Sequence, residues 1–171
     1  MRHLIICLLK ELGYIKISEA NDGAMAMRSF KAAEIVGAPI NFVITDYSMP
    51  IMDGLMLIRA IRESPELSHL PILVVTPEAT KENILAAAEA GTDDYIVKPL
   101  KATALQAKLD RIFAKVLSDS SRAKNSDFAN FVRAASDRAL SEHAAADQYV
   151  NLFRLGIFQS PRTKPRKPST H

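Results

Sequence analysis

Residues 41–54 read NFVITDYSMPIMDG, and this stretch predicts the type of fold. The run from Phe42 to Thr45 is apolar and largely β-branched, which indicates a strand buried on both faces. The strand ends at Asp46, and a carboxylate at the carboxyl end of a parallel strand lies where open α/β sheets bind ligands. Asp53-Gly54 then predicts the start of a helix capped by Asp53. Taken alone, Asp46 could serve a ligand or only accept hydrogen bonds from nearby main-chain N–H groups.

Two later strands end in groups that complement this carboxylate. Residues 70–76, LPILVVT, are apolar and end in the hydroxyl of Thr76, and residues 94–99, DYIVKP, place Lys98 at the end of a third strand. The carboxyl ends of parallel strands meet at one edge of a doubly wound sheet, so the three groups are expected to lie together. A carboxylate nucleophile, a hydroxyl donor and an ammonium counter-charge suit the transfer of a phosphoryl group.

These residues resemble a known family, the CheY-like receiver domains of bacterial two-component response regulators, and its chemotaxis branch in particular. The resemblance covers about residues 1–117 and implies an α/β fold, a doubly wound parallel sheet with strand order 2-1-3-4-5. It also implies a cis peptide bond before the proline that follows the lysine. The matching residues, in the order and spacing of the family, are Asp46, Met49-Pro50-x-Met52-Asp53-Gly54, Val75-Thr76, Tyr95 and Lys98-Pro99.

The resemblance implies a role for each of these groups. Asp46 would be the phosphoacceptor and would take its phosphoryl group from a histidine kinase. Lys98 would pair with the phosphoryl oxygens, while Thr76 and Tyr95 would act as the switch that reports phosphorylation. The face formed by residues 81–117 would bind a downstream protein target. The expected function is phosphorelay signal transduction, not enzymatic catalysis.

The order of elements expected from this sequence begins with a helix, and one element of the family is missing from it. The family begins one strand earlier, at the centre of the sheet, and that strand ends in two adjacent acidic residues that hold Mg²⁺ together with the acceptor. Asp93-Asp94 is an adjacent pair, but it precedes the last strand, at the wrong edge of the sheet. Of the metal ligands that the resemblance implies, only Asp46 and the backbone carbonyl of Ser48 remain. We therefore expect an N-terminally truncated receiver with strand 1 missing, doubtful Mg²⁺ binding and poor labelling of Asp46.

The remaining elements follow from hydrophobic periodicity and capping residues. Gly13, Gly37 and Gly91 stand where helices are expected to stop, and Ser64-Pro65 ends another. A short strand is expected at 15–17 because apolar and polar residues alternate there. The expected helices cover residues 1–12, 22–36, 53–63, 81–90 and 101–117.

Residues 118–171 differ in composition from the rest. We expect a polar linker at 118–126, a helical extension at 127–158 and a disordered, basic, proline-rich tail at 159–171. The apolar positions of the extension include Phe128, Phe131, Tyr149, Leu152 and Phe153. Such a helix could pack back on the receiver, self-associate, or dock another protein.

Charge and composition narrow the class of protein. Residues 1–117 hold 13 basic and 14 acidic residues, whereas residues 118–171 hold 9 and 5, so the basic excess belongs to the extension. No helix-turn-helix pattern accompanies it, so binding to nucleic acid is not supported. No apolar run approaches the roughly 18 residues that a membrane span needs. The single cysteine, Cys7, excludes an internal disulfide and favours a reducing, cytoplasmic location.

Two rival interpretations come from other classes. A phosphotransfer enzyme of the haloacid dehalogenase type also uses an aspartyl nucleophile after a strand, but it needs a second acid two residues further on, where this chain has Ser48. The other is a phosphorylation-incompetent pseudo-receiver or truncated gene product that acts only through protein contacts, and the absent acidic pair supports it.

Overall fold

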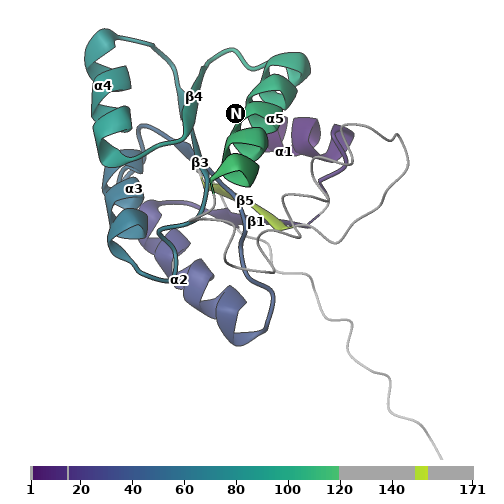
Figure 1. Cartoon of the computed structure of the whole chain (residues 1–171), viewed down its shortest axis with the longest axis vertical. Helices are drawn as coiled ribbons and strands as arrows, with labels where there is room; N and C mark the ends of the chain where they lie inside the picture. Colours follow the sequence, from purple (N-terminus) through teal and green to yellow (C-terminus); the bar gives the residue numbers. More distant parts are fainter. Residues whose placement is uncertain (1, 15, 120–148, 154–171) are drawn as a thin grey trace, which may run out of the picture.

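The chain folds into a parallel sheet covered by helices on both faces (Figure 1). The structure, a computed structural model, describes residues 2–14, 16–119 and 149–153. Helices and strands alternate up to α5, as the sequence predicts. The elements are α1 (Arg2–Glu11), β1 (Lys16–Ala20), α2 (Gly23–Ile35), β2 (Val43–Asp46), α3 (Gly54–Glu63), β3 (Ile72–Thr76), α4 (Lys81–Ala90), β4 (Asp94–Val97), α5 (Ala102–Ser118) and β5 (Tyr149–Phe153).

Local sequence signals explain where the helices begin and end. Asp53 caps α3, because its carboxylate accepts a hydrogen bond from the N–H of Met56 at 2.8 Å. Asp22 caps α2 in the same way, by accepting from the N–H of Met25. Gly91 ends α4 in the left-handed conformation with φ of 98°, which a residue without a Cβ adopts easily.

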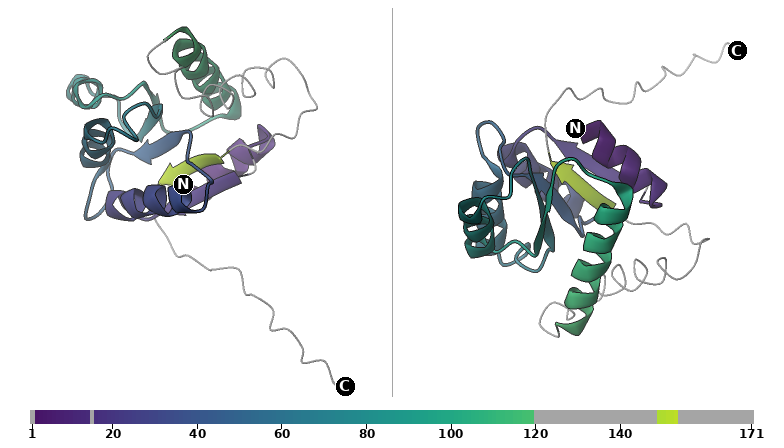
Figure 2. Two further views of the ribbon diagram at one scale, coloured as in Figure 1. Left: turned by 60° about the horizontal axis from the view of Figure 1, so that its bottom comes forward. Right: turned by 90° about the horizontal axis from the view of Figure 1, so that it is seen from above.

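Two hydrophobic clusters form the core, one on each face of the sheet. Because side chains alternate along a strand, Ile44 and Val75 face one cluster whereas Val43 and Val74 face the other. Helices α1 and α5 cover the first face, and α2 and α3 cover the second, as the two views of Figure 2 show. The buried ends of β2 and β3 thus place Asp46 and Thr76 at one edge of the sheet.

The centre of the sheet is occupied, which corrects the expectation of a missing central strand. The strand order is β1-β5-β2-β3-β4, with all neighbours parallel. β5, near the C-terminus, pairs with β1 along its whole length and with β2 through Val43↔Asn151, Ile44↔Leu152 and Thr45↔Phe153. It takes the position that the resemblance gives to the first strand of a receiver (Figure 1).

The predicted helical extension at 127–158 is therefore wrong at residues 149–153. The spacing of Tyr149, Leu152 and Phe153 fits one face of a helix, but a short apolar run fits a buried strand equally well. Neighbouring strands on both sides satisfy the backbone of β5, and such tertiary context overrides a local preference. The other residues of the extension, the linker from residue 120 onward and the tail at 159–171 lie outside the described residues.

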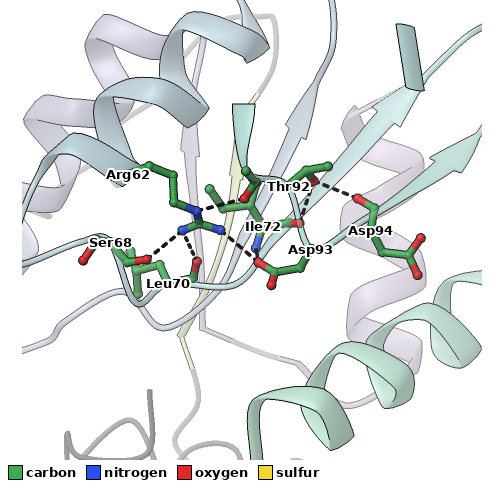
Figure 3. A network of polar contacts seen from close by, with 8 residues as sticks. Arg62, Ser68, Leu70, Ile72, Thr92, Asp93 and Asp94 are labelled. Carbon is green, nitrogen blue, oxygen red and sulfur yellow. Dashed lines mark hydrogen bonds and ion pairs between the residues drawn. The ribbon is translucent and has the colours of Figure 1, made fainter. Parts of the chain in front are cut away.

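Arg62, at the end of α3, joins the helix to the sheet at the edge opposite Asp46 (Figure 3). Its guanidinium donates to the main-chain carbonyls of Ser68, Leu70 and Gly91 at 3.0, 2.7 and 2.8 Å. It also donates to Oδ2 of Asp93 at 2.9 Å. That carboxylate, only 3% exposed, accepts a second bond from the N–H of Ile72, the first residue of β3. One side chain thus fixes the loops that start β3 and β4.

Two further observations concern expectations from the sequence. Cys7 is exposed on α1, although the apolar residues beside it in the sequence favour a buried position. Among residues 2–14, 16–119 and 149–153, none of the helices is both long enough and apolar enough to cross a membrane.

Candidate functional site

The ends of β2, β3 and β4 lie side by side at one edge of the sheet. The three strands are adjacent and parallel, with Asp46 in register with Val75, and Thr76 in register with Val97. Lys98 follows β4 directly. The structure therefore brings together the carboxylate, the hydroxyl-bearing strand end and the ammonium that the sequence places at strand ends.

Asp46 is engaged through both carboxylate oxygens. Its Oδ1 accepts a hydrogen bond from the N–H of Ser48 at 3.0 Å, and its Oδ2 pairs with Nζ of Lys98 at 2.5 Å. The side chains of Asp46 and Lys98 are only 4% and 12% exposed. The carboxylate thus accepts from a nearby main-chain N–H, as one interpretation of Asp46 has it, and it also pairs with a charged side chain across the edge. The peptide bond between Lys98 and Pro99 is cis, which confirms that expectation.

This buried pair links the ends of two strands, β2 and β4, across the strand between them. Lys98 extends from the end of β4 past β3 to the end of β2, so the ion pair spans the edge. Removing one partner of a buried ion pair leaves the other charge unpaired, which typically costs about 3–5 kcal/mol. The pair also places a positive charge beside Asp46, so a phosphoryl group on this carboxylate would contact the lysine ammonium directly.

The hydroxyl of Thr76 is bonded to the loop that follows β3. Its Oγ1 donates to the carbonyl of Glu78 at 2.8 Å and accepts from the N–H of the same residue at 3.3 Å. Thr76 is buried at 3% exposure. For the hydroxyl to bond a group on Asp46, the bond to the carbonyl of Glu78 must break, so the position of loop 77–80 is coupled to this rotation.

Tyr95 lies on β4 below a lysine of α5. Nζ of Lys108 is 5.2 Å from the centre of the tyrosine ring, a cation–π distance. The same ammonium pairs with Oδ1 of Asp94 at 2.7 Å. An inward rotation of Tyr95 would lose the contact with Lys108, which connects the ring position to α5.

Gly54 allows α3 to start directly against the end of β2, the strand that ends in Asp46. A Cβ at this position would overlap the main-chain carbonyl oxygen of Asp46 and would lie 3.2 Å from Cα of Tyr47. The N–H of Gly54 donates to the carbonyl of Tyr47 at 3.1 Å. The close approach of helix and strand therefore requires glycine.

The metal ligands that the resemblance implies do not fit Mg²⁺. Mg²⁺ takes about six oxygen ligands in octahedral geometry and commonly one or two carboxylates. Asp46 supplies a carboxylate already bound to Lys98, and Ser48 supplies one backbone carbonyl. In the part of the chain that the structure describes, no three His, Cys, Asp or Glu residues gather as a metal site. The central strand, β5, has the sequence YVNLF and so contributes no carboxylate.

Sequence reasoning missed two components of this edge. The partner of Thr76 is the main chain of Glu78, and no side-chain pattern reveals a main-chain partner. The role of Gly54 could have been inferred, since a glycine that opens a helix next to a functional strand often marks a close approach of two backbones.

Comparison with known proteins agrees with this geometry. The response regulator receiver domain family matches residues 1–110, and the chain belongs to this family. The chain is thus a receiver of two-component phosphorelay signalling, a signalling protein and not an enzyme.

The individual relatives include chemotaxis proteins and a solved receiver domain. The chain is 43% identical over 116 residues to the chemotaxis protein CheY-3 of Vibrio cholerae, a match that covers 68% of this chain and 85% of the relative. It is 40% identical over 116 residues to the chemotaxis protein CheY of Pseudomonas aeruginosa, covering 68% and 90%. Among solved structures, it resembles the receiver domain of a sensor histidine kinase from P. aeruginosa PAO1 with a TM-score of 0.56 and 29% identity, covering 64% of this chain and 85% of that chain. That structure holds a magnesium ion in its active-site cleft.

Proposed function

We propose that this receiver accepts a phosphoryl group on Asp46 from a histidine kinase and passes the signal on through a protein-binding face. The observation that carries the proposal is the buried pair of Asp46 with Lys98 at the common edge of β2, β3 and β4. The pair places a carboxylate nucleophile beside a cation that can neutralise the incoming phosphoryl oxygens.

The transfer itself is a displacement at phosphorus. An oxygen of Asp46 forms a bond to phosphorus while the bond from phosphorus to the donor breaks, and the donor atom leaves with the electron pair. With a histidine kinase, that atom is a ring nitrogen. Lys98 moves from the carboxylate to the new phosphoryl oxygens, so its charge is never left without a partner.

Thr76 and Tyr95 then carry the change away from Asp46. The hydroxyl of Thr76 leaves the carbonyl of Glu78 for the phosphoryl group, which releases the loop before α4. Tyr95 turns into the space behind it and leaves Lys108 of α5. A local change in charge is thus converted into a new arrangement of one surface.

The surface that changes lies within residues 81–117, on α4, β4 and α5. Leu85 and Val97 are exposed apolar side chains there, with 56% and 37% of their surfaces accessible. Both side chains lie on elements that the proposed change involves, so they offer apolar surface to a protein partner there. The single cysteine, Cys7, supports a cytoplasmic site of action.

The acceptor role is tested by labelling the full chain with acetyl phosphate and measuring its intact mass. We expect one phosphoryl group, added slowly because one ammonium faces several negative oxygens. Peptide mapping should place the group on Asp46. Asp46→Asn should abolish the label, and Lys98→Met should reduce it further below the slow rate of the unmodified chain.

Two outcomes would contradict the acceptor role. Label that survives in Asp46→Asn would place the chemistry elsewhere. A folded chain that takes no label at all would favour the alternative, a pseudo-receiver that acts only through protein contacts. The absence of carboxylates from β5 is the observation that supports this alternative.

A further inference from the structure

The strand beside the acceptor strand comes from the C-terminal part of the chain. β5 runs parallel to β2, and its last residue, Phe153, is in register with Thr45, the residue before Asp46. Because parallel strands end at the same edge, β5 ends at the edge that carries Asp46. Whatever the end of the central strand contributes to this edge therefore comes from β5.

The residues of β5 cannot replace a metal-binding strand end. Its five residues are Tyr, Val, Asn, Leu and Phe, and the next residue along the chain is Arg154. Neither the five strand residues nor Arg154 has a carboxylate side chain. On the other side of Asp46, β3 ends in Thr76, whose hydroxyl is bonded to Glu78. Lys98, which follows β4, brings its ammonium to Asp46 at this edge.

We infer that β5 makes the acceptor edge of this chain independent of divalent cations, because by filling the central position it provides a strand without carboxylates, while Lys98 supplies a counter-charge to Asp46. The inference rests on the proposed function only in taking Asp46 as the acceptor. Its test measures cation binding and not phosphorylation, so either can fail without the other.

The first arm titrates Mg²⁺ into the full chain and follows the amide signals of Asp46, Ser48 and Lys98 by NMR. We expect no saturable shift at millimolar Mg²⁺. Saturable shifts at these residues that disappear in Asp46→Asn would overturn the inference.

The second arm restores an acidic pair directly after β5 with the double variant Arg154→Asp/Leu155→Asp. The strand residues stay unchanged, and circular dichroism checks that the variant is folded. We expect the variant to gain saturable Mg²⁺ binding that depends on Asp46. The gain should appear as saturable shifts of the Asp46, Ser48 and Lys98 amides at millimolar Mg²⁺, where the unmodified chain shows none, because one or two added carboxylates are the ligands that Mg²⁺ commonly takes.

A matched control distinguishes the effect of where the acidic residues are placed from the effect of their added negative charge. Arg162→Asp/Thr163→Asp makes the same change in net charge in the basic tail, and we expect no gain from it. An equal gain in the control would contradict the inference, because it would show general attraction to an acidic chain. A folded Arg154→Asp/Leu155→Asp variant without any gain would also overturn it, because the end of β5 would then not border Asp46.

Discussion

Replacing Asn151 with proline is expected to lower the free energy of unfolding by about 2–4 kcal/mol. β5 has neighbours on both sides, so each interior N–H of the strand faces either β1 or β2. Proline removes one of these donors, and the buried carbonyl left without it accounts for roughly 1–3 kcal/mol. The ring adds a steric conflict, which is why proline is confined to edge strands and bulges. Urea unfolding followed by circular dichroism measures the effect.

Asn151→Ala is the matched control, because it changes the same side chain but keeps the N–H. We expect its free energy of unfolding to remain clearly closer to that of the unmodified chain. If the proline and alanine variants were equally stable, residues 149–153 would not form a central strand.

Replacing Arg62 with alanine is the other change with a large expected effect. Asp93, only 3% exposed, would lose its guanidinium, and the carbonyls of Ser68, Leu70 and Gly91 would lose their donor. Since removing one partner of a buried ion pair costs about 3–5 kcal/mol, a loss of about 3 kcal/mol or more is expected. Thermal unfolding of the variant measures it.

Arg59→Ala tests whether the effect belongs to the network and not to the helix. Arg59 lies on the same helix but is exposed, so its removal should change the stability by no more than about 0.5 kcal/mol. Arg62→Lys should recover only part of the loss, because an ammonium cannot reproduce the planar fork of donors. Equal stabilities of Arg62→Ala and Arg59→Ala would contradict the role given to the network.

Much of the receiver could be predicted because its signals are local. The apolar run before Asp46, the capping carboxylate of Asp53 and the glycine at residue 91 each act within a few residues of their place in the chain. The meeting of Asp46 with Lys98 followed from one general rule, that parallel strands end at a common edge.

The features that escaped prediction depend on contacts distant in sequence. Arg62 looks like any arginine near the end of an amphipathic helix, and its partners are mostly main-chain carbonyls up to 29 residues away. β5 is separated from α5 by residues 119–148, and its short apolar run carries no periodicity that distinguishes strand from helix. Its place in the sheet follows from the open position between β1 and β2, which no local pattern describes.

The occupied centre also changes the interpretation of the site. An expected gap beside Asp46 pointed to a receiver with a broken sheet, whereas the structure has a complete sheet whose central strand lacks acidic residues. The sheet is therefore complete even though its central strand lacks the metal ligands that the family has there. The chain keeps the strand ends that carry Asp46, Thr76 and Lys98. The central strand beside them, β5, has no acidic residue.

Hydrogen exchange of the unmodified chain tests the place of β5 most directly. If β5 is the central strand, the amides of residues 150–153 should exchange as slowly as those of residues 43–45 in β2, because both sets lie in the interior of one sheet. Exchange of residues 150–153 at the rate of an unstructured peptide, with β2 still protected, would contradict a sheet completed by the C-terminal strand.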